Sequence, residues 1–90
     1  MQGLVKELRR TYPNPVLSSL DIRFSLGSSE TISLYLYNAI GKRIITSVEN
    51  QRYSAGRYSV RMDLSDFPSG IYFTILSAGG VNYVRKVIRL

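Results

Sequence analysis

The sequence contains no cysteine, no histidine and no tryptophan among its 90 residues. The absence of cysteine excludes disulfide bonds and thiolate chemistry, and the joint absence of cysteine and histidine excludes the common structural zinc sites. Without histidine, the chain also lacks the side chain most often used for proton transfer near neutral pH. These absences argue against an enzyme, and we expect neither catalytic activity nor a bound cofactor or metal.

Acidic residues are also scarce, because six Asp and Glu stand against twelve Lys and Arg, which gives a formal net charge of +6. A surface of this kind attracts anionic partners such as nucleic acids or lipid head groups. No apolar run approaches the roughly 20 residues of a membrane-spanning helix. The first residues show no pattern of a secretory signal peptide. The length is that of a single folded domain.

Apolar and polar residues alternate with a period of two along most of the chain, which is the pattern of half-buried β-strands. The alternating segments are 20–26, 32–37, 44–48, 58–64, 71–76 and 81–90, preceded by an ambiguous segment at 4–10. Turn-forming residues separate them, among them Phe67-Pro68-Ser69-Gly70 and Ser77-Ala78-Gly79-Gly80. About seven short strands and no helix predict an all-β domain, a single antiparallel β-sandwich in preference to a small barrel.

The last of these segments carries apolar residues on both of its sides. One side holds Val84, Ile88 and Leu90 and is the more apolar, although it also holds Lys86; the other side holds Tyr83, Arg85, Val87 and Arg89. Charged side chains of this kind are typical of an edge strand and discourage pairing with other chains. A partner could use the same edge by strand addition, and a second copy could use it in an edge-paired or swapped dimer.

Two short motifs could carry chemistry, but each has a simpler structural explanation. Asp63 and Asp66 could form a calcium or acid-base pair, yet Asp and Ser beside Pro-Gly usually bind the backbone of their own turn. Ser69-Gly70 lacks the upstream glycine of a nucleophile elbow, and the chain has no histidine to activate the serine. We therefore interpret both motifs as turns.

Arginine and tyrosine alternate along several of the predicted strands. The residues involved are Arg23, Arg43, Arg57, Arg61 and Arg85 with Tyr35, Tyr37, Tyr58, Tyr72 and Tyr83. Aromatic side chains on a basic sheet hold single-stranded nucleic acid, and exposed tyrosines also stack on sugars. The same pattern is expected of the solvated outer face of a sandwich, and the aromatic signature of RNA recognition motifs is absent. We favour the solvated face and no nucleic-acid partner, and keep a basic module that binds single-stranded nucleic acid or carbohydrate as the alternative function.

Several short motifs also follow one another along the chain. They are Tyr12-Pro13-Asn14-Pro15, Ile22-Arg23-Phe24, Leu34-Tyr35-Leu36-Tyr37-Asn38 with Gly41-Lys42, Leu64-Ser65 before Phe67-Pro68-Ser69-Gly70-Ile71-Tyr72-Phe73, and Arg85-Lys86-Val87-Ile88. In this order they resemble, over nearly the whole chain, the C-terminal sorting domain of cargo proteins of the type IX secretion system in Bacteroidetes-type bacteria. The resemblance implies a non-enzymatic Greek-key sandwich that directs an N-terminally attached cargo from the periplasm through the outer-membrane translocon. It also implies that a sortase-like surface peptidase removes the domain as the cargo is anchored to an anionic lipopolysaccharide.

The resemblance further assigns roles to individual residues. It places recognition by the secretion machinery on Gly70, Ile71 and Tyr72 and on the last five residues, Lys86, Val87, Ile88, Arg89 and Leu90. It gives a structural role to Tyr12, Pro13, Asn14, Pro15, Asn38, Gly41 and Pro68. The tail of the family often carries a second lysine four residues after the first, where this chain has Leu90 with Arg89 beside it.

The resemblance also predicts how the chain is divided and where it acts. We expect residues 4–90 to form the sorting domain and Met1-Gln2-Gly3 to be residues added by cloning. Cleavage is expected in or before Leu4 to Thr11, because a peptidase needs extended and accessible chain ahead of the packed strands. The domain is expected in the periplasm during transit, and afterwards at the outer membrane or cell surface or secreted.

Overall fold

The computed structural model of the chain describes residues 7–8 and 15–90. Seven strands make up its regular structure: β1 (Glu7–Leu8), β2 (Ser19–Leu26), β3 (Glu30–Asn38), β4 (Arg43–Tyr53), β5 (Gly56–Asp63), β6 (Gly70–Ala78) and β7 (Val81–Arg89). Within these described residues no helix is long and apolar enough to cross a membrane.

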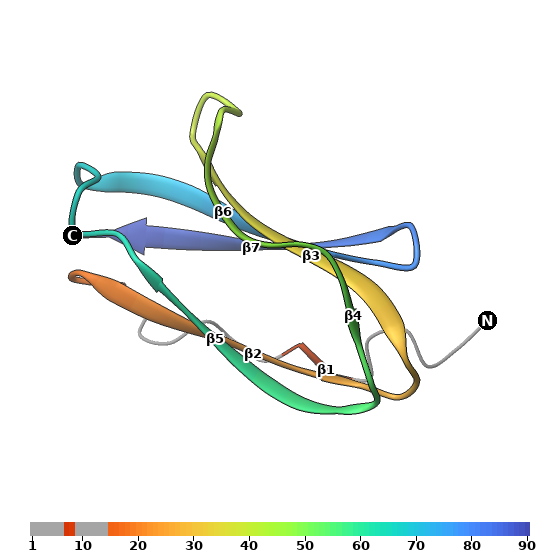
Figure 1. Ribbon diagram of the computed structural model, residues 1–90. Coiled ribbons are helices and arrows are strands. Elements are labelled where there is room, and N and C mark those ends of the chain that lie inside the picture. The colour runs from red at the N-terminus through yellow and green to blue at the C-terminus, as the bar shows by residue number, and fades with distance from the viewer. Residues whose placement is uncertain (1–6, 9–14) are drawn as a thin grey trace.

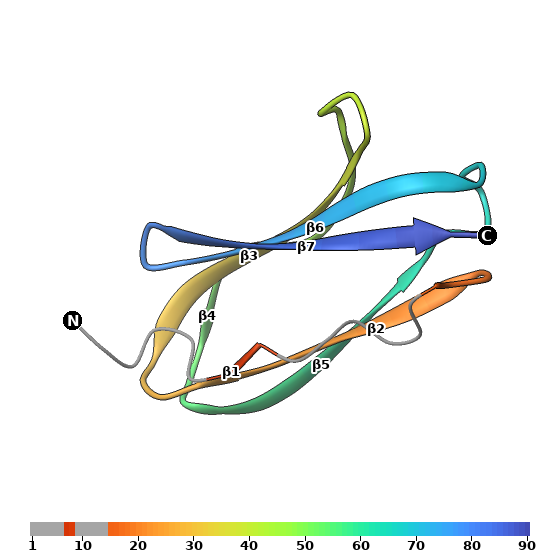
Figure 2. The ribbon, with the colours of Figure 1, turned by 180° about the vertical axis from the view of Figure 1, so that it is seen from behind.

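The strands form two sheets that face each other, three strands below and four above in the view of Figure 1 and again from behind in Figure 2. The smaller sheet has the order β1-β2-β5 and the larger sheet the order β4-β3-β6-β7, with every pair of neighbouring strands antiparallel. Because β2 pairs with β5 and β3 with β6, the chain crosses repeatedly between the sheets, as in Greek-key sandwiches. The prediction of an all-β antiparallel Greek-key sandwich is confirmed.

The core lies between the two sheets and is built from alternate residues of the strands. The largest fully buried side chains are Leu20, Ile22, Ile32, Leu34, Leu36, Met62, Leu64, Leu76, Val16 and Val87. In β2 and β3 the apolar members of the alternation found in the sequence are buried, together with Ser25 and Ser33, and in β5 Met62 is buried. Period-two burial follows from the pleat of a strand, which points successive side chains to opposite faces.

The less apolar side of β7 faces the core, although the composition of the strand favours burial of the other side. Val87 is fully buried and Tyr83 is half-buried, whereas Val84, Ile88 and Leu90, on the more apolar side, are 49%, 39% and 59% exposed. The reason lies in the pairing with β6, since Val87 stands opposite the inward-facing Tyr72 and residues paired across a sheet share a face. The more apolar side of the last strand therefore forms part of the outer surface.

β4 is longer than the segment 44–48 predicted for it. It continues through Glu49, Asn50, Gln51 and Arg52 to Tyr53, although these polar residues show no alternation. Asn50 has a φ angle of 50° at an irregularity of the pairing with β3, and its N–H donates a 2.9 Å hydrogen bond to Ser33 Oγ. A bulge on an edge strand accounts for the lost periodicity.

Candidate functional site

The two segments predicted to be recognised by a secretion machinery lie side by side. In the antiparallel pair of β6 and β7, Gly70 stands opposite Arg89, Ile71 opposite Ile88, and Tyr72 opposite Val87. Figure 2 shows the start of β6 and the end of β7 at the same end of the four-stranded sheet. Residues that are 15 to 19 positions apart in the sequence thus form one continuous surface.

Arg89 is held against the domain by three backbone carbonyl groups. Its Nε donates to the carbonyl oxygen of Leu64 at 2.9 Å, and its Nη1 donates to those of Leu90, at 2.8 Å, and Leu17. Leu64 follows β5, and Leu17 precedes β2, so the guanidinium group joins three segments that are distant in the sequence. Arg89 is half-buried, and its charge is engaged by the domain itself.

The segment that precedes β2 closes the outer edge of β7 at its C-terminal end. Val16 forms a parallel bridge with Arg89, in which Val16 N–H donates to Ile88 O at 2.8 Å and Leu90 N–H donates to Val16 O at 2.9 Å. A strand added at this position would have to displace Val16. Pro15 is exposed beside this bridge, while Tyr12, Pro13 and Asn14, for which a structural role was predicted, lie outside the described residues.

The turn between β3 and β4 is organised by Asn38. Its Oδ1 accepts hydrogen bonds from Ile40 N–H at 3.2 Å and Lys42 N–H at 2.9 Å, and its backbone carbonyl accepts one from Gly41 N–H at 3.0 Å. Gly41 has a φ angle of 86°, which side chains with a Cβ rarely adopt. This arrangement leaves Ile40 88% exposed at the tip of the turn.

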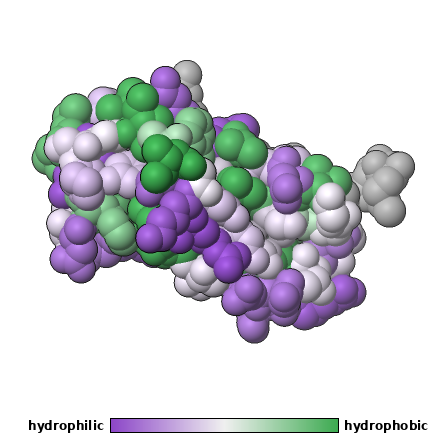
Figure 3. Space-filling view, turned by 90° about the horizontal axis from the view of Figure 1, so that it is seen from above, coloured by the Kyte–Doolittle hydropathy of each residue, from purple (hydrophilic) through white to green (hydrophobic). Residues whose placement is uncertain are grey.

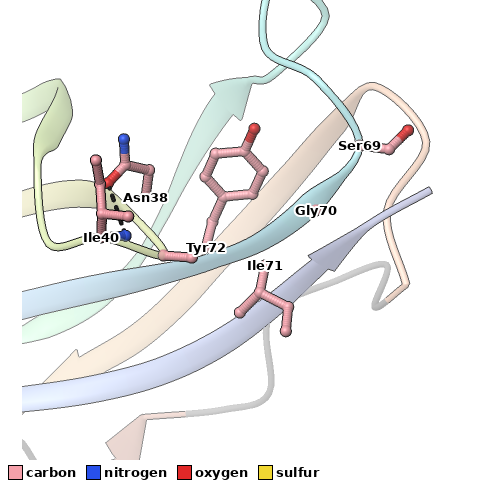
Figure 4. A pocket seen from close by; sticks show the side chains of 7 residues that line it. Asn38, Ile40, Ser69, Gly70, Ile71 and Tyr72 are labelled. Atoms are coloured by element: carbon pink, nitrogen blue, oxygen red, sulfur yellow. Dashed lines mark hydrogen bonds between the residues drawn. The ribbon is translucent and has the colours of Figure 1, made fainter.

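A shallow recess of about 250 Å³ lies between this turn and the start of β6. It is lined by Asn38, Ala39, Ile40, Ser69, Gly70, Ile71 and Tyr72. In Figure 4, Ile71 and Tyr72 project to opposite sides of β6, and Ile40 lies on the neighbouring turn. The lining contains no carboxylate, lysine or arginine, and Ala39, Ile40 and Ile71 belong to it, so the recess suits an apolar group.

Tyr72 ties the start of β6 to the loop before it. Its hydroxyl donates a 2.5 Å hydrogen bond to the carbonyl oxygen of Pro68, four residues earlier, and its ring is buried beside Phe67. A tyrosine that binds the backbone a few residues upstream is a known device for fixing the corner of a sandwich. Pro68 and Tyr72 together therefore hold the Ser69-Gly70 side of the recess.

Replacing Tyr72 with phenylalanine is expected to lower the free energy of unfolding by about 1 kcal/mol, because the ring stays buried while one hydrogen bond is lost. Urea denaturation followed by tyrosine fluorescence or circular dichroism measures this difference. Tyr37→Phe is the matched control, since its half-buried ring lies on the outer face of β3. Equal stability of the two variants would contradict the structural role of the Tyr72 hydroxyl.

Asp63 stabilises the turn that contains Leu64, the residue whose carbonyl group accepts a hydrogen bond from Arg89. Its Oδ1 accepts a 2.9 Å hydrogen bond from Ser65 N–H, and this bond, with a further contribution from the nearby charge of Arg89, lowers the pKa of the Asp63 carboxyl. The pKa of Asp21 is lowered as well, chiefly by its hydrogen bond with Arg61 at 3.0 Å. Both carboxylates favour the folded state only while they are ionised.

The domain is therefore expected to lose stability in acid. A pKa that is lower in the folded state contributes stability above the ordinary value of 3.8, and this contribution disappears as the pH falls below that value. Thermal denaturation measured from pH 6 to pH 2 should show a falling melting temperature below about pH 4. In Asp63→Asn, which keeps an oxygen acceptor for Ser65 N–H, the decline should be shallower; an unchanged decline would contradict the assignment to Asp63.

The tyrosines proposed as a stacking platform do not share one face. Tyr58 packs between the sheets, with its ring 5.6 Å from that of Phe24, and Tyr72 is buried. Tyr35 lies on the outer face of the larger sheet, with the guanidinium of Arg43 4.5 Å from its ring centre.

Among the described residues, no group of three His, Cys, Asp or Glu side chains could hold a metal ion.

Comparison with known proteins identifies a family. A family model described as "Secretion system C-terminal sorting domain" matches residues 10–89. No curated protein and no solved structure matches the chain. The matched residues include 70–72 and 86–89, which meet at the ends of β6 and β7, and members of this family are typically non-catalytic. The chain belongs to the family of type IX secretion C-terminal sorting domains.

Proposed function

We propose that this domain directs an N-terminally attached cargo through the outer-membrane translocon of the type IX secretion system by presenting one end of its larger sheet. Membership of the sorting-domain family supports the role in secretion. The observation that carries the proposal is the direct pairing of Gly70, Ile71 and Tyr72 with Val87, Ile88 and Arg89. Recognition then depends on a folded surface and not on a linear tail.

The residues of this surface divide into two roles. Lys86, Ile88 and Leu90 are exposed and would contact the machinery, together with Ile71. Buried side chains, Tyr72 and Val87 among them, and the half-buried Arg89 would hold this surface in shape. The charge of Lys86 would add to the rate and specificity of the encounter with an acidic partner.

The remaining steps of the proposal concern the fate of the cargo. After passage through the periplasm and the outer membrane, a sortase-like surface peptidase would cut the chain in or before residues 4–11, and the cargo would be anchored at the cell surface or released. β1, which lies within this stretch, pairs with Phe24 and Ser25. Cleavage there would require β1 to leave the edge of the smaller sheet, which its two residues make easy.

An export assay tests the proposal directly. Residues 4–90 are fused to the C-terminus of a periplasm-targeted reporter in a bacterium with a working type IX system, and surface reporter is measured with and without residues 86–90. The intact fusion should reach the surface, and the truncated fusion should stay in the periplasm. Retention of both fusions in the periplasm would overturn the proposed function.

A further inference from the structure

An exposed apolar surface covers the end of the larger sheet at which the two recognition segments meet. We call it the outer patch, and it consists of Leu17, Ile40, Ile71, Ile88 and Leu90, which are 69%, 88%, 41%, 39% and 59% exposed. Figure 3, which looks down on the four-stranded sheet, shows hydrophobic side chains gathered over this end of the molecule. Exposed patches of contiguous aliphatic side chains on a small domain mark interaction sites.

The pairing of the strands makes the outer patch continuous. Ile71 and Ile88 are direct cross-strand partners, and Ile40 and Ile71 line the same recess. Leu90 lies two residues after Ile88 and therefore on the same side of the strand. Because Val16 is bridged to Arg89, Leu17 comes next to Leu90. Four segments that are separate in the sequence thus contribute to one surface.

Positive charge borders the outer patch. The adjacent row of the sheet runs through Arg43, Tyr37, Phe73 and Lys86, with a cation at each end and two aromatic rings between them. β6 and β7 contain no Asp or Glu, and neither does the turn from Ala39 to Lys42. The acidic residue of β3, Glu30, lies eight residues from Asn38, about 26 Å along the strand.

The backbone edge next to the outer patch is already engaged. Ile88 O and Leu90 N–H are bonded to Val16, and Val84 O accepts a 3.1 Å hydrogen bond from Arg85 Nη1. Strand addition needs backbone groups that point outward and are open. A partner at this end therefore finds side chains on the face of the sheet more readily than a backbone edge.

We propose that the outer patch is a docking face for an acidic protein surface, which inserts an apolar side chain into the recess between Ile40 and Ile71 and sets carboxylates against Lys86 and Arg43. The inference rests on the proposed function and adds how the partner is held. Charge complementarity favours an acidic partner, because the two charged side chains of the adjacent row, Lys86 and Arg43, are both cations. A recess accepts a protruding side chain, which a protein offers and a fluid lipid surface does not.

The export assay with single substitutions tests the docking face. Ile88→Asp and Lys86→Glu should each reduce surface reporter at least tenfold, whereas Lys86→Arg should retain export. Val81→Asp is the matched control, because Val81 is 41% exposed on the same strand but lies at its other end. Melting of each purified 90-residue variant shows whether it is folded. Ile88→Thr, which keeps a β-branched side chain, replaces Ile88→Asp if the latter does not fold.

The outcomes separate the docking face from the sorting role. If the unchanged domain is not exported, the proposed function fails whatever the substitutions do. If it is exported and folded Ile88→Asp and Lys86→Glu variants are exported as well as Val81→Asp, the docking face is overturned and the sorting role stands. Sedimentation of the purified chain with vesicles of three parts phosphatidylethanolamine to one part phosphatidylglycerol, lost on Ile88→Asp, would replace the protein partner by a lipid surface and overturn the inference.

Discussion

An Arg89→Ala variant is expected to lose about 2 kcal/mol of stability, because three backbone carbonyls lose a charged donor and are left at the junction of three segments. In a domain of this size such a loss lowers the melting temperature by roughly 10 °C. Thermal and urea denaturation of the 90-residue chain measure both quantities. Arg89→Lys should recover only a part, since an ammonium group cannot reach the carbonyls of Leu64 and Leu17 as a planar guanidinium does.

The matched control for this prediction is Arg57→Ala, because Arg57 is exposed near the start of β5. Its stability should stay within about 0.5 kcal/mol of the unchanged domain. If Arg89→Ala were as stable as Arg57→Ala, the hydrogen bonds of Arg89 to the three carbonyl groups would not stabilise the fold. Arg89 would then be better regarded as a charge presented to the secretion machinery.

The fold could be predicted where strands carry apolar residues on one side only. Leu20, Ile22 and Phe24 alternate with polar residues, and a one-residue shift would place every one of them in water. In β7 both sides carry apolar residues, so the alternation could not indicate that Val87 is buried and Ile88 exposed. Only the pairing with β6 decides between the two sides.

The site could be predicted in part. The resemblance to sorting domains singled out both segments. The turn at Gly79-Gly80 also indicated that they are in contact: a two-residue turn pairs Ala78 with Val81, and continuing this antiparallel pairing along both strands places Gly70 opposite Arg89. The roles of Val16, Ile40 and Leu64 could not be predicted, since each depends on a contact between segments that no local pattern encodes. The hydrogen bonds of Arg89 to Leu64 and Leu17 could not be predicted for the same reason.

A Leu34→Asp variant is expected to unfold the domain and to abolish export. Leu34 is fully buried in β3, which pairs with both β4 and β6, and an unpaired carboxylate there costs several kcal/mol. This loss approaches the total stability of a small domain. The variant leaves residues 70–72 and 86–90 unchanged in sequence, so it separates a folded recognition surface from a linear signal. Circular dichroism measures folding, and the surface reporter measures export.

Thr31→Asp is the control, because it introduces the same charge at an exposed position of the same strand and should leave folding and export intact. If the unfolded Leu34→Asp domain were still exported, the machinery would read the last residues as an extended segment, and the pairing of Ile71 with Ile88 would have no part in recognition. If the Leu34→Asp domain lost both its fold and its export, recognition would instead require the surface that β6, β7 and Val16 assemble. No shorter stretch of the chain contains that surface.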